Sequence, residues 1–194
     1  MNKTQQILNE IFTNIDTTDL LPSEFVAQSW EYYQVNCDVS NSLNGYVFEG
    51  IIMMALAQEN ISPIYEQVEL TYVNHAIFDI FLYSEEMSYA LSLKTSLRER
   101  WKQADLEGLA LKQVHKKSKN YILTLSDEEV QRRRNDDVDY HSLDGFILAD
   151  TPEFDELVSE LRQREFEVAG TVTIIKHDRQ SHTYDTLRNL YNLD

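Results

Sequence analysis

The chain has 194 residues, of which 42% are hydrophobic, and these values predict one compact domain over 1–194 with a sizeable core. A formal net charge of −16 argues against a protein that coats nucleic acid regardless of sequence, because such binding depends on neutralising phosphates. The single cysteine, Cys37, excludes an internal disulfide and a cysteine-rich zinc site. We recognise neither a signal peptide nor an apolar run near the roughly 20 residues of a membrane helix, so we expect a cytoplasmic protein outside the membrane.

The charge is unevenly distributed along the chain. From Lys94 to Arg134 there are eleven Lys and Arg against six Asp and Glu, a local charge of +5 that leaves −21 for the remainder. A solvated helix face is the ordinary explanation of such a stretch. The alternative is a site-specific DNA binder on an acidic body.

The first third of the sequence favours helices. In chain order the pattern predicts an amphipathic helix over 3–14, a helix start signal at 17–19 with a segment through Tyr33 that could be helical, a break at 42–45, and a largely buried helix over 46–57. Glu49 is the only charge in this last helix.

After Pro63 the pattern changes to short strands that alternate with helices. We expect strands over 65–73, 76–83 and 89–95, a helix over 96–113, a strand over 121–125, a helix from 126, a strand over 145–149 and a helix opened by Thr151 and Pro152. This order predicts an α/β fold with a central mixed β-sheet flanked by helices. Beyond Arg164 a strand over 168–175 and a short helix over 184–193 have no assigned purpose, although an oligomer contact would suit their apolar pattern.

The hairpin formed by the second and third strands brings two charges together. A four-residue turn at 84–87 places Asp79 opposite Ser92, and the period-two alternation of strands then puts Asp79, Ser92 and Lys94 on one face. Burying either charge is costly unless it is paired or binds a metal, which favours a functional site over a purely structural Asp–Lys pair. The other face is then apolar, with Phe78, Ile80, Leu91 and Leu93.

This arrangement suits phosphodiester hydrolysis, which needs a hard cation, carboxylates to hold it and a group that orients the attacking water. Asp79 could hold the cation, and Lys94 could contact the water and the scissile phosphate. A second carboxylate is missing at Ser92, and Glu107 on the following helix is the candidate to replace it. Taken alone, Glu107 would be read as a solvated helical glutamate.

Asp79 followed by Ser92, Leu93 and Lys94 resembles the core of a PD-(D/E)xK nuclease whose central acid has moved. The stretch from Lys94 to Glu107 resembles the corresponding segment of the EcoRII and NgoMIV branch of type II restriction endonucleases. The resemblance implies a restriction-endonuclease-like core in which Glu107 supplies the missing carboxylate. It also implies that Glu49 supports a second metal or the water network. Phe78 departs from the pattern, since the family usually has proline there.

The same resemblance implies an Mg²⁺-dependent endonuclease that hydrolyses double-stranded DNA at specific sites and so restricts foreign DNA. Arg98, Glu99 and Arg100 would read bases, and a target with CC and GG steps follows because arginine pairs with guanine and a carboxylate with the cytosine amino group. An exposed charge cluster without a reading role is the alternative. Ser92 and Lys102 are further expected DNA contacts, and cutting both strands implies a homodimer or higher homo-oligomer.

Two other functions stay open at this point. A structure-selective or repair nuclease would share the same core but respond to DNA shape. A non-catalytic DNA-binding or protein-binding module would keep the fold without hydrolysis, and the acidic body favours it modestly. A zinc hydrolase is not expected, because the five histidines show no HxxxH or HExxH spacing.

Overall fold

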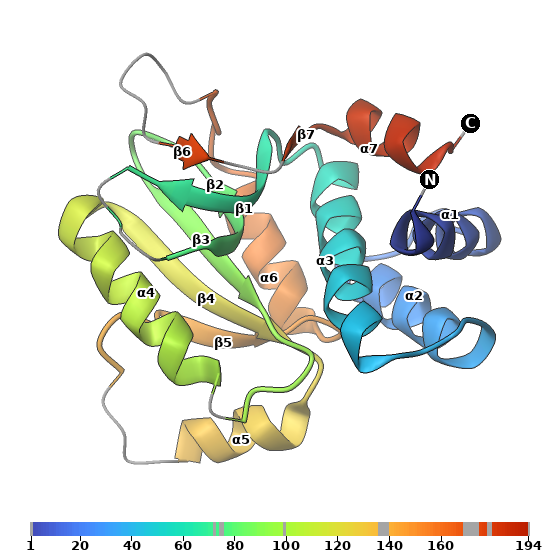
Figure 1. Cartoon of the computed structure of the whole chain (residues 1–194), viewed down its shortest axis with the longest axis horizontal. Helices are drawn as coiled ribbons and strands as arrows, with labels where there is room; N and C mark the ends of the chain where they lie inside the picture. Colours follow the sequence, from blue (N-terminus) through green and yellow to red (C-terminus); the bar gives the residue numbers. More distant parts are fainter. Residues whose placement is uncertain are drawn as a thin grey trace.

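A mixed β-sheet with helices on both faces forms the centre of the molecule in the computed structural model, which describes residues 2–71, 73, 76–98, 100–135, 140–168, 175–177 and 180–193 (Figure 1). The helices are α1 (Lys3–Asn14), α2 (Pro22–Asn36), α3 (Asn41–Gln58), α4 (Arg100–Val114), α5 (Asp127–Asn135), α6 (Pro152–Leu161) and α7 (Tyr184–Tyr191). The strands are β1 (Ile64–Leu70), β2 (Phe78–Leu82), β3 (Ser88–Leu93), β4 (Ser118–Thr124), β5 (Gly145–Leu148), β6 (Ile175–His177) and β7 (Gln180–His182). The predicted α/β class with a flanked mixed sheet is confirmed.

The strand order explains where the site lies. The strands follow the order β5-β4-β3-β2-β1, with β6 and β7 both paired with β1. Strands β5, β4 and β3 are parallel to one another, whereas β2 is antiparallel to both β3 and β1. The end of β3 therefore lies beside the beginning of β2, and these two strand ends carry Lys94 and Asp79.

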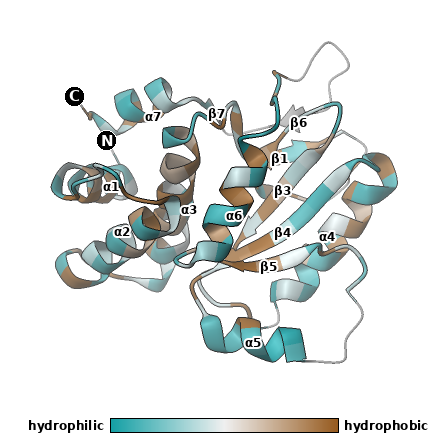
Figure 2. Cartoon of the chain, turned by 180° about the vertical axis from the view of Figure 1, so that it is seen from behind, coloured by the Kyte–Doolittle hydropathy of each residue, from teal (hydrophilic) through white to brown (hydrophobic). Residues whose placement is uncertain are grey.

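The larger core lies on one face of the sheet. Helix α3 packs against β3 there and is surrounded by α1, α2 and α7, while α6 packs against β5 (Figure 1). Figure 2 shows hydrophobic colouring along much of α3 and along parts of the strands, whereas α5 is largely hydrophilic. Within the described part of the chain, no helix is long and apolar enough to cross a membrane.

Helix α4 covers the opposite face of the sheet. Its Trp101 belongs to an apolar cluster with Ile122 of β4, Val130 of α5 and Phe146 of β5. Its Leu111 joins a second cluster formed by β1, β2 and β3. The basic stretch predicted from the sequence thus includes a helix that is packed on one side and charged on the other.

The outer edge of the sheet, at β5, is covered by side chains. Arg134 donates to the carbonyl oxygen of Phe146 (2.7 Å), and Glu153 accepts from the amide of Leu148 (3.1 Å). The two side chains also form an ion pair (2.8 Å). Together they satisfy two backbone groups that an added strand would otherwise use.

Several predicted boundaries were wrong for local reasons. The start signal at 17–19 does not open α2, because Asp19 has a left-handed backbone (φ 59°) and the helix begins at Pro22. The break predicted at 42–45 is instead the first turn of α3, where the amides of Leu43 and Asn44 bond to the carbonyl of Ser40.

Two further predicted segments differ from the structure or lie partly outside the described residues. Residues 96–98 are not helical, and the helix predicted from 96 begins at Arg100, with residue 99 outside the described residues. Of the strand predicted over 168–175, residues 169–174 lie outside the described residues, and the structure places β6 at Ile175–His177. The helix predicted over 184–193 is present as α7.

Candidate active site

The hairpin register predicted from the sequence is confirmed. Ile80 pairs with Leu91, which places Asp79 opposite Ser92. The ammonium group of Lys94 lies 2.6 Å from Oδ2 of Asp79, and the amide of Leu93 donates to the same oxygen at 2.7 Å. The carboxylate of Asp79 is therefore fixed in place by one charge and one backbone donor.

The apolar face of the hairpin was predicted with one error. Ile80, Leu91 and Leu93 contribute to the main core as expected. Phe78 instead joins the cluster beneath α4, with its ring 6.2 Å from that of Phe81. It is the first residue of β2, opposite Val68 of β1, and that neighbour belongs to the same cluster.

Glu49 reaches the same site from α3. Its side chain is linked to Asp79 by Gln67 of β1, whose Nε2 donates to Oε2 of Glu49 and to Oδ1 of Asp79, each at 3.2 Å. Glu49 is only 9% exposed. Burial raises its pKa to about 8, and the charges of Asp79 and Glu66 add to the effect. The negative charges of Asp79 and Glu66 around Glu49 thus outweigh the positive charge of Lys94.

Glu107 lies nearby on α4 but is not bonded to the other acids. Its Oε1 accepts from the amide of Gln103 (2.8 Å). Burial raises its pKa, Gln103 and the charge of Lys94 oppose that shift, and the charge of Asp79 adds to it. Within the described ranges, no three or more His, Cys, Asp and Glu side chains form a group that could hold a metal ion. Asp79, Glu107 and Glu49 are therefore not assembled as one set of ligands here.

The close approach of α4 to the sheet depends on Gly108. A Cβ at this position would lie 1.8 Å from Nδ2 of Asn120 and 2.4 Å from Oγ of Ser142. Asn120 is fully buried in β4, and its Nδ2 donates to the carbonyl of Ala104 at 3.1 Å. Gly108, which follows Glu107 in the chain, thus lets this part of α4 pack closely against β4.

An open pocket of about 460 Å³ combines the acids with the predicted base-reading arginines. Its lining includes Glu49, Gln67, Asp79, Arg98 and Arg100. Negative and positive groups are segregated within it, the former on α3 and β2 and the latter at the turn after β3 and the first residue of α4. Such a pocket can accept a cation beside the carboxylates and a polyanion beside the arginines.

The turn that carries Arg98 is fixed by Glu129 of α5. Oε2 of Glu129 accepts from the amide of Leu97 (2.7 Å), and Oε1 accepts from the amide of Arg98 (3.1 Å). Burial alone would raise the pKa of Glu129, but these backbone hydrogen bonds outweigh it and lower the pKa. Arg98 itself has a left-handed backbone (φ 37°), which stops α4 from starting earlier.

The other predicted DNA contacts differ in accessibility. Arg98 and Arg100 are exposed. Lys102 is also exposed and lies over the ring of Trp101, 5.6 Å from its centroid. Ser92 is buried, with 3% of its surface exposed, so it presents no surface to a duplex in this structure. Glu99 lies outside the described residues.

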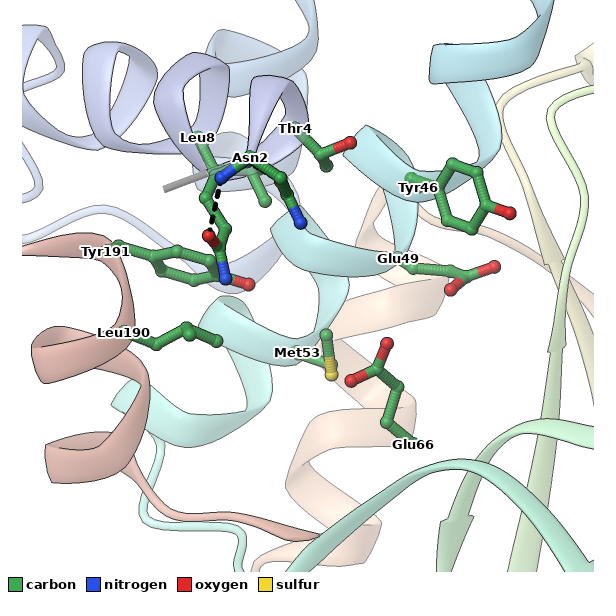
Figure 3. A pocket seen from close by; sticks show the side chains of 10 residues that line it. Asn2, Thr4, Leu8, Tyr46, Glu49, Met53, Glu66, Leu190 and Tyr191 are labelled. Atoms are coloured by element: carbon green, nitrogen blue, oxygen red, sulfur yellow. Dashed lines mark hydrogen bonds between the residues drawn. The ribbon is translucent and has the colours of Figure 1, made fainter. Parts of the chain in front are cut away.

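A second cavity of about 230 Å³ adjoins the site behind Glu49. Figure 3 shows Glu49 and Glu66 on one side of it and Tyr191 of α7 on the other. Glu66 lies 3.0 Å from Nε2 of His182, and burial raises the pKa of Tyr191. Sequence reasoning missed Glu66 and Gln67, because β1 is joined to β2 by a long connection that does not fix their register.

The donor set fits a hard divalent cation. Two carboxylates, Asp79 and Glu49, face one shared amide, and oxygen ligands of this kind are those that Mg²⁺ and Ca²⁺ prefer. A cation between them would also relieve the repulsion that contributes to the raised pKa of Glu49.

Comparison with known proteins identifies the fold. No protein-family model matches the chain, and no curated protein sequence matches it. Among solved structures, the chain is similar to one described as "Restriction endonuclease PspGI-substrate DNA complex", with 13% identity and a TM-score of 0.52 over 100% of this chain and 95% of that one. At this identity the likeness shows the fold alone, and the chain therefore has the restriction-endonuclease-like α/β fold.

Proposed function

We propose that the chain is an Mg²⁺-dependent endonuclease that cuts double-stranded DNA at specific sites. The observation that carries the proposal is the Asp79–Lys94 pair (2.6 Å) at two adjacent strand ends, linked through Gln67 to the buried Glu49. The structural neighbour is described as a restriction endonuclease with its substrate DNA, which supports the same class of reaction for this fold.

The residues of the site divide the chemistry among them. Asp79 and Glu49 would hold the cation, which when bound supplies positive charge against the charge that develops on the phosphate. Lys94, held by Asp79, would orient the attacking water and the scissile phosphate. Arg98 and Arg100 would bind the duplex beside the carboxylates, since both are exposed in the same pocket.

The finer assignment follows the resemblance to the EcoRII and NgoMIV branch. Under this proposal Glu107 would turn from Gln103 towards the cation when DNA binds, and the attraction of Lys94 for its carboxylate favours that side of the pocket. The target would contain CC and GG steps read by the turn at 98–100. The chain would act as one endonuclease domain, with a homodimer or higher homo-oligomer supplying two centres for two strands.

Cleavage of unmethylated plasmid and phage DNA tests the proposal. We expect discrete fragments in Mg²⁺, none in EDTA, and a loss of at least about a hundredfold in rate for Lys94→Ala. Lys112→Ala is the matched control, because Lys112 forms a similar ion pair with Asp144 (2.7 Å) away from the pocket. Equal losses in the two variants would refute a special role for Lys94.

The same assay separates the alternatives. Mg²⁺-dependent and Lys94-dependent cutting without discrete fragments would identify a structure-selective or non-specific nuclease, which branched and nicked substrates would then distinguish. Retention on a DNA column at low salt without cutting would identify a binding module instead.

A further inference from the structure

We propose that Gln67 is a ligand of the cation site: its amide N–H group bridges the carboxylates of Glu49 and Asp79, and its carbonyl oxygen would take the place of that donor when a divalent cation binds. This inference rests on the cation site of the proposed function. It adds to the two carboxylates a neutral oxygen donor from a third element, β1.

Strand pairing places Gln67 at this point. Tyr65 pairs with Phe81 and Val68 with Phe78, so Gln67 lies opposite Asp79 in the same antiparallel ladder. Its backbone is left-handed (φ 50°), although it is neither glycine nor at a strand end. Such a conformation costs free energy and persists only where its surroundings impose it, which is typical of functional sites.

The chemistry of the amide supports an exchange of its two ends. With Nε2 at 3.2 Å from both carboxylates, the amide supplies the hydrogen bonds that two neighbouring acceptors need. A cation in that space would repel the N–H donor and attract the carbonyl oxygen, and a half-turn of the terminal torsion exchanges the two. Amide carbonyl oxygens are ordinary ligands of hard divalent cations.

The alternative sources of a third ligand are limited. Within the part of the chain that the structure describes, no third acidic, histidine or cysteine side chain completes a metal-binding group with Asp79 and Glu49. The carboxylate of Glu107 is bonded to Gln103, and under the proposed function it would reach the cation only when DNA binds. Gln67 is the side chain that already contacts both carboxylates.

Binding of Mn²⁺ alone, followed by the electron paramagnetic resonance signal of the free ion, tests the proposal without any cleavage reaction. The wild-type chain is compared with its Gln67→Leu and Gln67→Gly variants. Leucine keeps the size of the side chain but removes the amide, and glycine also relieves the left-handed backbone. The matched control is Gln131→Leu, because Gln131 also donates its amide to a carboxylate, that of Asp127 (3.1 Å).

We expect the Kd for Mn²⁺ to rise about tenfold in both Gln67 variants and to stay unchanged in Gln131→Leu. Gln67→Gly should unfold in EDTA at a urea concentration no lower than the wild type, so a loss of ion binding there cannot come from a damaged fold. This variant decides the question if Gln67→Leu does not fold. Mn²⁺ affinity equal to or above that of the wild type in Gln67→Gly would overturn the proposal.

Failure of this inference and failure of the proposed function are distinguishable. Mn²⁺ binding that depends on Gln67 in a protein that cuts no DNA would keep the ligand and refute the nuclease. Site-specific cutting together with Mn²⁺ binding that does not depend on Gln67 would keep the nuclease and refute the ligand role of Gln67.

Discussion

Replacing Gly108 by alanine tests whether the contact between α4 and β4 is as tight as the structure indicates. The new methyl group would lie 1.8 Å from Nδ2 of Asn120, about half of an ordinary contact distance, and 2.4 Å from Oγ of Ser142. Neither neighbour can simply swing away, because both are buried. Either the Asn120 side chain gives up its bond to the carbonyl of Ala104, or α4 moves off the sheet.

The expected change in the free energy of unfolding is the sum of two destabilising contributions and one stabilising contribution. Overpacking of a well-packed interior costs about 1–3 kcal/mol. A buried amide that loses its hydrogen bond costs about 1–3 kcal/mol more. Alanine recovers about 1 kcal/mol through its higher helix propensity. We therefore expect Gly108→Ala to lower the free energy of unfolding by about 3 kcal/mol.

Equilibrium urea denaturation measures this loss, and a double-mutant cycle assigns its cause. In an Asn120→Ala background the nearest clashing atom is gone, so the cost of Gly108→Ala should fall by about half or more, leaving the contact with Ser142. An unchanged or higher stability in the single variant would refute the reasoning, since it would show that helix propensity outweighs the clash. Because Glu107 adjoins the glycine, DNA cleavage should fall further than stability alone explains.

Two more predictions concern charges at the site. The pKa of Glu49 is raised from 4.5 to about 8, so the wild type should lose stability as pH rises through that window. In EDTA, urea denaturation should therefore show the free energy of unfolding of Glu49→Gln rising relative to that of the wild type, by on the order of a few kcal/mol between pH 5 and pH 8. A difference between the two proteins that does not depend on pH would contradict the raised pKa of Glu49. Glu129→Gln removes the charge that fixes the turn at 97–98, and target DNA should bind about tenfold more weakly in Ca²⁺. Glu128→Gln, at an exposed position on the same helix, should leave binding unchanged, and equal effects would contradict the role of Glu129.

The hairpin was predictable because a short turn couples its two strands. Once residues 84–87 form the turn, the positions of Asp79 and Lys94 follow from alternation alone, and the structure places them in contact. The amphipathic helix at 3–14 and the start of α6 at Pro152 were likewise set by local signals.

The rest of the site depends on contacts between distant residues. Gln67 meets Asp79 through a strand pairing that no short turn specifies, and Glu129 reaches back from α5 to fix residues 97 and 98. The helix predicted over 96–113 therefore began too early in the chain. The hydrogen bond from the amide of Arg98 to Glu129 accompanies a left-handed backbone at Arg98, which a helix does not accommodate. Glu107 was placed on the correct helix, yet its bond to Gln103 follows from side-chain geometry that periodicity does not describe.

The ion pair of Arg134 and Glu153 limits how copies of this chain can assemble. With the carbonyl of Phe146 and the amide of Leu148 already bonded, a second copy cannot continue the sheet through β5 without first breaking that pair. A two-fold assembly that keeps this ion pair would be built through helices, loops or the opposite border of the sheet. The same pair also protects the protein against edge-to-edge aggregation through β5, a hazard of exposed sheet edges.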